Sequence, residues 1–212
     1  MVVPSMTKKE IALHLLSEIH NNQKRIVVKT GMAAKKMQKV GKKIHTYQQR
    51  VGSNTLLTIY IYGIDDTGVD YAVGCWFRSD KGLCWATCGQ LDDVVFYTDH
   101  FFERYAERYL RKSMTTHDAA KEFYREFKVS MALHTEEITD GVYKMQLPLH
   151  VGGLALGFHD RINNIIVYNT YVSPELLYEK QVNDVEAYRE LNEALESMNS
   201  PEWRLIGEAT KS

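Results

Sequence analysis

At 212 residues the chain is long enough to bury a sizeable core, either as one domain or as two small ones. Its 44% of hydrophobic residues excludes an intrinsically disordered chain. No apolar run approaches the roughly 18 residues that a membrane span needs, so we expect no contact with the membrane interior. The formal net charge of −1 is typical of an ordinary globular protein.

The first segment of the chain predicts helices. Thr7 precedes Glu10 by three residues, which is the pattern of a capping box at a helix start. Apolar residues then recur at helical spacing through residues 11–19. The polar run at 21–23 weakens this pattern, and we expect a second, mostly helical segment at 30–50 with one apolar stripe among its lysines.

The charges are distributed unevenly along the chain. No Asp or Glu occurs between Ile19 and Ile64, whereas residues 173–196 are strongly acidic. Either the acidic stretch packs against the basic one, or the basic segment faces a polyanion such as RNA or DNA. In the second case the nucleic-acid-binding residues would be Lys35, Lys36, Lys39, Lys42 and Lys43.

Residues 55–90 have the pattern of three antiparallel strands. The stretches "TLLTIYIYGI", "VDYAVGCWFR" and "LCWATCGQ" are rich in β-branched and aromatic residues. The connectors "DDTG" and "SDKG" have the composition of hairpin turns. The next stretch, "DVVFY", adds a fourth short strand or leads into the following helix.

The second half of the chain predicts three helices and three more strands. We expect two helices at 98–112 and 115–133. The strand candidates that follow are "VYKMQLP", "GLALGFH" and "NIIVYNTYV". A last helix is expected at 174–198, because a proline directly after Ser173 is a common start signal.

This order of elements predicts an α+β fold. We expect an antiparallel sheet of about six strands, in one group or as 3+3, with flanking helices. The fold would also include a long N-terminal helical region and a C-terminal helix. Residues 1–212 would form a single domain. The alternative is a subdivision into a helical and three-stranded part, 1–92, and a helix-helix-sheet part, 93–212.

Three cysteines, Cys75, Cys84 and Cys88, lie in aromatic, strand-like sequence. Their number is odd and no signal peptide precedes them, so we expect buried thiols in a reducing cytosol. A zinc site needs four ligands at suitable spacing, and these cysteines match that spacing poorly. We therefore expect a cytoplasmic protein with no metal and no cofactor.

The stretch "DHFFERYAER" places His100, Arg104 and Arg108 on one side of a helix, and we call these three residues the stripe. Like charges four residues apart destabilise a helix by about 0.2–0.5 kcal/mol. Either nearby acids or a bound anion must offset this repulsion. Glu107 lies three residues from Arg104 and four from Arg111, so salt bridges are one explanation. The sequence leaves both explanations open.

The pattern H-x-x-x-R-x-x-x-R opens one helix, a second helix and strands follow, and the last strand, "IIVYNTYVS", carries a late threonine. In these features residues 98–173 resemble the small bacterial metal-independent ribonuclease domains of the barnase/EndoU/colicin/RelE-like group. The resemblance covers about a third of the chain. The order of the elements contributes more to it than the three letters of the motif.

The resemblance implies a site for RNA cleavage through a cyclic phosphate. Such cleavage needs a group that transfers protons near neutral pH, which suits histidine, and cations around the phosphorane, which suit arginine. By the resemblance His100 is the acid–base residue, Arg104 and Arg108 hold the phosphate, and Thr170 is a donor. Strand alternation sends Tyr171 to the face opposite Thr170, so only one of them can face this site.

Two functional hypotheses follow for a cytosolic bacterial or phage-type protein. The first is a metal-independent ribonuclease-like or RNA-binding protein that acts on the phosphodiester backbone through the stripe. The second is a non-catalytic interaction protein whose stripe forms surface salt bridges, and whose basic and acidic segments pair internally or across a homodimer. His159 in "GFHDRIN" is interpreted as a turn histidine, so no second proton-transfer group is evident.

Overall fold

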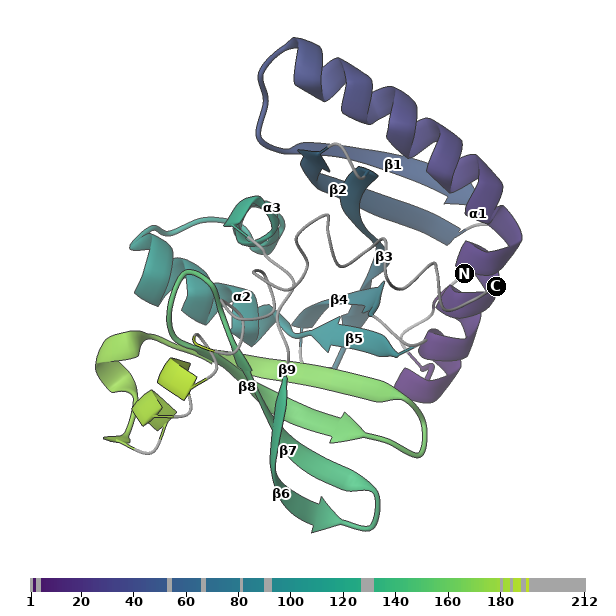
Figure 1. The fold of residues 1–212 in the computed structure, drawn as a ribbon. Coiled ribbons are helices and arrows are strands. Elements are labelled where there is room, and N and C mark those ends of the chain that lie inside the picture. The colour runs from purple at the N-terminus through teal and green to yellow at the C-terminus, as the bar shows by residue number, and fades with distance from the viewer. Residues whose placement is uncertain are drawn as a thin grey trace, which may run out of the picture.

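The nine strands of the computed structural model form one sheet that has helices on both faces (Figure 1). The structure describes residues 2, 5–52, 55–65, 68–80, 82–89, 93–126, 132–179, 181–183, 185–187 and 190. In chain order the elements are α1 (Lys8–Lys39), β1 (His45–Val51), β2 (Thr55–Asp65), β3 (Gly68–Ser79), β4 (Gly82–Cys88), β5 (Val94–Tyr97), α2 (Asp99–Tyr105), the π-helix η1 (Ala106–Leu110), α3 (Thr116–Glu126), β6 (Leu133–Thr139), β7 (Val142–Pro148), β8 (Leu154–Asp160), β9 (Ile165–Val172) and the 3-10 helix η2 (Pro174–Leu176).

The strand order is β1-β2-β3-β4-β5-β9-β8-β7-β6. All neighbouring strands are antiparallel except the central pair β5 and β9, which are parallel, with Val94 beside Ile165. The α+β class is therefore confirmed. The prediction of an antiparallel sheet of about six strands is corrected to a mixed sheet of nine, because β5 joins the two halves of the chain.

Two of the additional strands lie where the sequence predicted something else. β1 occupies the end of the segment expected to be helical at 30–50. Gly41, with a φ of 64°, follows α1, and the chain then pairs with β2 from His45 onward. β6 is an edge strand in which every residue from His134 to Thr139 is exposed, so it has no apolar alternation that periodicity could detect.

Helix α1 is continuous over 32 residues, which corrects the expectation of an interruption at 21–23. The Asn22 side-chain amide donates to the Glu18 carbonyl at 2.9 Å, and that of Asn21 donates to the Ser17 hydroxyl at 3.4 Å. These bonds stay within the helix. The predicted capping box of Thr7 and Glu10 is confirmed.

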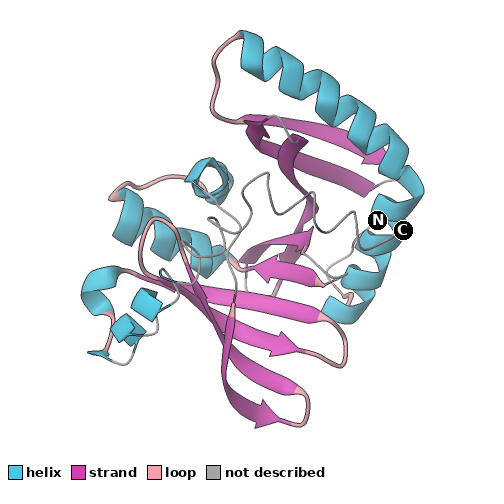
Figure 2. Cartoon of the chain, viewed as in Figure 1, coloured by secondary structure: helices cyan, strands magenta, loops and turns pink. Residues whose placement is uncertain are grey.

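The two faces of the sheet are covered by different helices, because alternate residues of each strand point to opposite sides (Figure 2). Helix α1 packs on one face, where its buried Leu15 and Ile26 meet Ile59 and Val167. Helices α2 and α3 pack on the other face. The core between these two helices and the sheet is largely aromatic and includes Tyr60, Trp85, Tyr97, Phe101, Phe102, Tyr105, Phe123, Tyr124, Tyr168 and Tyr171.

The helix expected at 174–198 begins as η2, and most of its remainder lies outside the described residues. The hypothesis that the acidic stretch packs against the basic segment falls largely on those residues. Among the helices that the structure describes, none combines the length and apolarity of a membrane span.

Candidate functional site

The stripe lies on the outer side of α2 and η1. Thr98 caps α2: its hydroxyl accepts from the Phe101 backbone at 3.3 Å and donates to the Asn169 carbonyl of β9 at 3.0 Å. Phe101 and Phe102 are fully buried against the sheet, which turns His100 toward solvent. Helix α2 is therefore attached to β9 through its cap and its aromatic face.

Two residues of the stripe have acidic neighbours on their own helix. Nδ1 of His100 lies 3.8 Å from the Glu103 carboxylate, and the Arg104 guanidinium lies 2.5 Å from that of Glu107. Arg111 does not pair with Glu107 but reaches Glu175 at 3.3 Å. The charge on Arg104 is thus offset by Glu107 without a bound anion, and His100 has a carboxylate neighbour.

Arg108 is the residue of the stripe that contacts the sheet. One of its guanidinium N–H groups donates to the backbone carbonyl of Tyr171 at 2.8 Å. The contact is made from the π-helix η1, which ends at Arg111 in the left-handed conformation, with a φ of 54°. π-Helical turns are rare and are frequent at functional sites. Here the turn joins α2 to the last strand.

Thr170 is not brought to the stripe. Tyr171 faces the aromatic core, where its ring lies 5.5 Å from that of Tyr105. The neighbouring Thr170 therefore points to the opposite face of the sheet, away from α2. A register shift in β8 and β9, between the pairs Leu156–Thr170 and Gly157–Tyr168, does not reverse this arrangement.

The predicted nucleic-acid-binding lysines lie on the second half of α1 and the turn after it. All five are exposed, and so are Lys24, Arg25 and Lys29 of the same helix. We call these eight residues, Lys24, Arg25, Lys29, Lys35, Lys36, Lys39, Lys42 and Lys43, the basic surface. Within the part of the chain that the structure describes, none of them forms an ion pair with a carboxylate.

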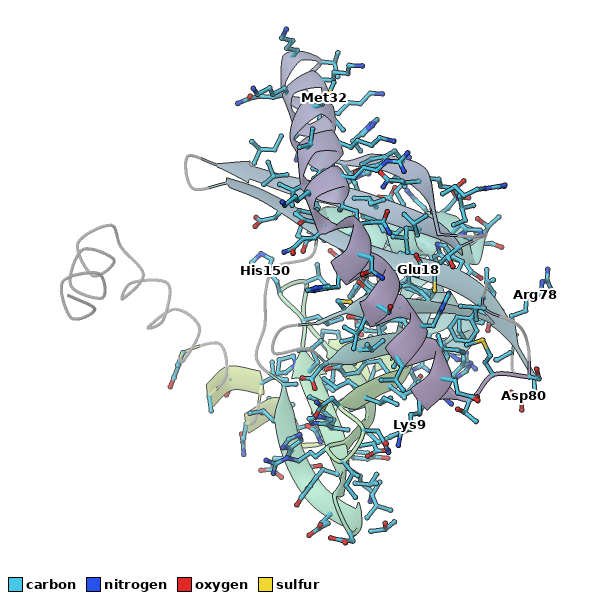
Figure 3. All side chains as sticks on the ribbon, turned by 90° about the vertical axis from the view of Figure 1, so that its right-hand side faces the viewer. Lys9, Glu18, Met32, Arg78, Asp80 and His150 are labelled. Carbon is cyan, nitrogen blue, oxygen red and sulfur yellow. The ribbon has the colours of Figure 1, made fainter. Side chains whose placement is uncertain are left out.

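Exposed apolar side chains lie among these cations. Val28 and Met32 are 62% and 61% exposed. In Figure 3 the end of α1 that carries Met32 extends beyond the strands, and nitrogen-tipped side chains surround it. The basic surface and the stripe are on opposite faces of the sheet, because α1 and α2 cover opposite faces.

A third cluster, which the sequence did not predict, joins β6, β8 and the start of β5. Nδ1 of His159 lies 2.9 Å from Nε2 of His134, within hydrogen-bond distance. Nε2 of His159 lies 3.7 Å from the Asp93 carboxylate. The side chains of His159 and Asp93 are only 13% and 18% exposed, whereas His134 is exposed at the edge of the sheet. We call these three residues the Asp–His–His chain.

Two further side chains extend this row. The Tyr143 ring of β7 lies 5.1 Å from the His134 ring, and the Arg161 guanidinium lies 5.7 Å from the centre of the Tyr143 ring. Desolvation by burial lowers the pKa of His159, and the Asp93 carboxylate opposes that effect. The Asp–His–His chain therefore holds a partly buried imidazole whose pKa is lowered.

Sequence reasoning missed this cluster for a physical reason. His159 pairs with Tyr143 across β7 and β8, while His134 comes from a strand without an apolar pattern. Only the pairing register brings these residues together. "GFHDRIN" does contain a histidine close to a turn, but His159 belongs to β8, so the interpretation as a turn histidine is corrected.

Among the described residues, no group of three or more His, Cys, Asp or Glu side chains is arranged to hold a metal ion. No protein-family model, curated protein or solved structure matches the chain. The function is therefore argued from the geometry of the stripe, the basic surface and the Asp–His–His chain.

Proposed function

We propose that this protein binds nucleic acid, RNA in particular, through the phosphate backbone on the basic surface. The observation that supports this proposal is the exposure of eight cations on one helix and its following turn, without a carboxylate partner among the described residues. Clustered lysines and arginines on one helix are the electrostatic footprint of a nucleic-acid-binding protein.

The dimensions of the helix suit a phosphate backbone. Lys24 and Lys39 are 15 residues apart on α1, which corresponds to about 22 Å along the helix axis. Over that length a nucleic acid presents many phosphates, since a duplex carries one charge per roughly 1.7 Å of axis. The exposed Val28 and Met32 lie among the cations, where they can contact sugars and bases.

The first prediction concerns Lys35, Lys36 and Lys39. Replacing all three by Gln is expected to weaken binding of a single-stranded RNA. Each lysine that contacts a phosphate releases counterions from the RNA, and the Gln variant loses this contribution. The slope of log K against log salt should become shallower by about 0.7 for each phosphate that is no longer neutralised. Fluorescence anisotropy titrations at several salt concentrations measure this slope.

The matched control replaces three exposed lysines away from the basic surface, Lys9, Lys112 and Lys121, by Gln. Both triple variants have the same net charge, so a general charge effect would change their slopes equally. Equal slopes for the two variants would contradict the proposal. Binding of the wild type to vesicles of anionic lipid but not to RNA would assign the surface to a membrane instead.

For the stripe we propose that it is a salt-bridged surface without catalytic function. The contacts of His100 with Glu103 and of Arg104 with Glu107 support this role. The ribonuclease-like hypothesis draws its support from the order of α2, α3 and the four strands β6 to β9, which is the order that the resemblance implies.

The second prediction separates these roles. His100→Ala and Arg104→Ala are expected to leave both RNA affinity and any RNA cleavage unchanged, because Glu103 and Glu107 on the same helical segment already lie against these two side chains. Gel assays of cleavage and anisotropy measurements of binding test this in parallel. A loss of cleavage by about 100-fold, the scale of acid–base catalysis, would instead establish the stripe as a ribonuclease site.

A further inference from the structure

The Asp–His–His chain connects a nearly buried carboxylate to an exposed imidazole. Nε2 of His159 is buried and has no hydrogen-bond partner among the described residues, and the Asp93 carboxylate is the anion that it faces at 3.7 Å. The other nitrogen of the same ring lies 2.9 Å from Nε2 of His134. Asp93, His159 and His134 thus follow one another as acid, middle imidazole and exposed group. A catalytic triad has the same order, and in it the acid orients the middle histidine.

The carboxylate determines which nitrogen atoms carry protons. An ionised Asp93 only accepts, so it favours the proton of His159 on Nε2. Nδ1 of His159 is then an acceptor, and the hydrogen bond requires Nε2 of His134 to donate. The remaining nitrogen of His134, Nδ1, keeps its lone pair. In the neutral ring of His134 this second nitrogen is able to accept a proton.

A cation in the same row as His134 can bind an anionic substrate. The Arg161 guanidinium lies over the neighbouring Tyr143 ring, and Arg161 itself is exposed. Lys144 of the same strand as Tyr143 is already paired with Glu136 at 2.5 Å, so Arg161 is the cation that this row offers. Arg161 and His134 both lie against the Tyr143 ring, so a guanidinium and a proton-accepting imidazole share one neighbour. This combination suits a phosphodiester, which has a negative charge next to the group under attack.

We propose that the Asp–His–His chain is an acid–base site for phosphodiesters of ribonucleotides, with His134 as the catalytic residue and His159 and Asp93 as positioning residues. This inference rests on the proposed RNA binding for its biological substrate. It places the proton-transfer group on β6, at the edge of the sheet, and not on the stripe.

The reaction step balances without a further reactant. Nδ1 of His134 takes the proton of the 2′-hydroxyl while that oxygen forms a bond to phosphorus. The bond from phosphorus to the leaving oxygen breaks, and the leaving oxygen takes a proton from solvent or departs as an anion. A cyclic phosphate and the released group are the products. His134 returns its proton to solvent through Nδ1.

The experiment uses the whole chain and two substrates. One is a single-stranded RNA. The other is uridine 3′-(4-nitrophenyl phosphate), which is too small to need the basic surface and releases a coloured anion. His134→Ala is expected to lower the rate on both by about 100-fold, while RNA affinity is unchanged. His20→Ala, an exposed histidine of α1, is the matched control and should keep the wild-type rate.

Three readouts distinguish proton transfer from a structural role. Added imidazole should restore part of the rate of His134→Ala. The rate of the wild type should rise with pH and then level off, because a general base acts in its unprotonated form. Asp93→Asn should lower the rate by about tenfold or more, since the wrong imidazole tautomer is then stabilised.

The outcomes separate this inference from the proposed function. RNA that is bound but not cleaved, with no release of nitrophenolate, overturns the acid–base site and leaves nucleic-acid binding intact. Nitrophenolate release that depends on His134, without RNA binding, supports the site and overturns the proposed function. Cleavage that His134→Ala does not reduce also overturns the site.

Discussion

Arg104 and Arg108 are four residues apart on one helical segment, yet their surroundings give them different roles. Arg104 pairs with the exposed Glu107 on the surface, where ion pairs contribute little. Arg108 donates to the carbonyl of Tyr171 in the last strand, in a partly buried position. The shared motif therefore combines a surface charge with a structural contact.

The third prediction compares these two arginines. Arg108→Ala is expected to lower the free energy of unfolding by about 1–2 kcal/mol, because the Tyr171 carbonyl loses a charged donor. Arg104→Ala should change it by no more than about 0.5 kcal/mol. Urea unfolding of both variants measures the difference. Equal losses for the two would show that Arg108 has no structural role.

At the scale of elements, the pairing of β8 with β9 depends on a close approach of two backbones. A side chain at Gly157 would meet the carbonyl oxygen and carbon of Val167. The register shift beside Gly157 occurs at this contact. Both His159 and the end of β9 that Arg108 contacts depend on the pairing of these strands.

The fourth prediction follows from that contact. Gly157→Ala is expected to lower the free energy of unfolding by about 3 kcal/mol, because backbone atoms cannot move aside as a side chain can. Gly31→Ala is the contrasting variant: it lies in α1 with open space around it, so it should raise the same free energy by about 0.5–1 kcal/mol. Thermal unfolding measures both. A Gly157 variant as stable as the wild type would contradict this register of β8 and β9.

At the scale of the molecule, the Asp–His–His chain links the edge of the sheet to its centre and makes stability depend on pH. Burial is the largest cause that lowers the pKa of His159 from the ordinary value of 6.5, and His134 and Arg161 act in the same direction. The Asp93 and Asp160 carboxylates act in the opposite direction. The folded protein therefore takes up this proton less readily than the unfolded chain does.

The fifth prediction is the sign of that dependence. The unfolded chain binds the proton at a higher pH than the folded protein does. The contribution of His159 to the free energy of unfolding is therefore complete above about pH 6.5, and it decreases as the pH falls through the folded pKa of His159. His159→Gln should reduce this decrease. Urea unfolding from about pH 7.5 to about pH 5.5 tests it. An identical pH dependence in wild type and variant would contradict the contribution of His159.

Local patterns predicted many elements of this fold. Residues 55–64, 69–78 and 83–88 are rich in β-branched and aromatic residues and lie between hairpin connectors, and they belong to β2, β3 and β4. The helix with the stripe begins at Asp99, one residue into the predicted segment 98–112, and Thr98 caps it through a contact over three residues. β1 and β6 have no comparable local pattern. Pairing with a neighbouring strand stabilises them, so their own sequence does not need one.

Short-range spacing was sufficient to identify the basic surface, because its cations lie within residues 24–43, a stretch without acids that forms the second half of one helix and the turn after it. Spacing also placed the stripe on one helical side. The Asp–His–His chain required the fold: Asp93, His134 and His159 are far apart in sequence, and they meet through the parallel pairing of β5 with β9 and the register of β6 to β8. Strand pairing is set by burial and hydrogen bonding over the whole sheet, so no short stretch of sequence contains it.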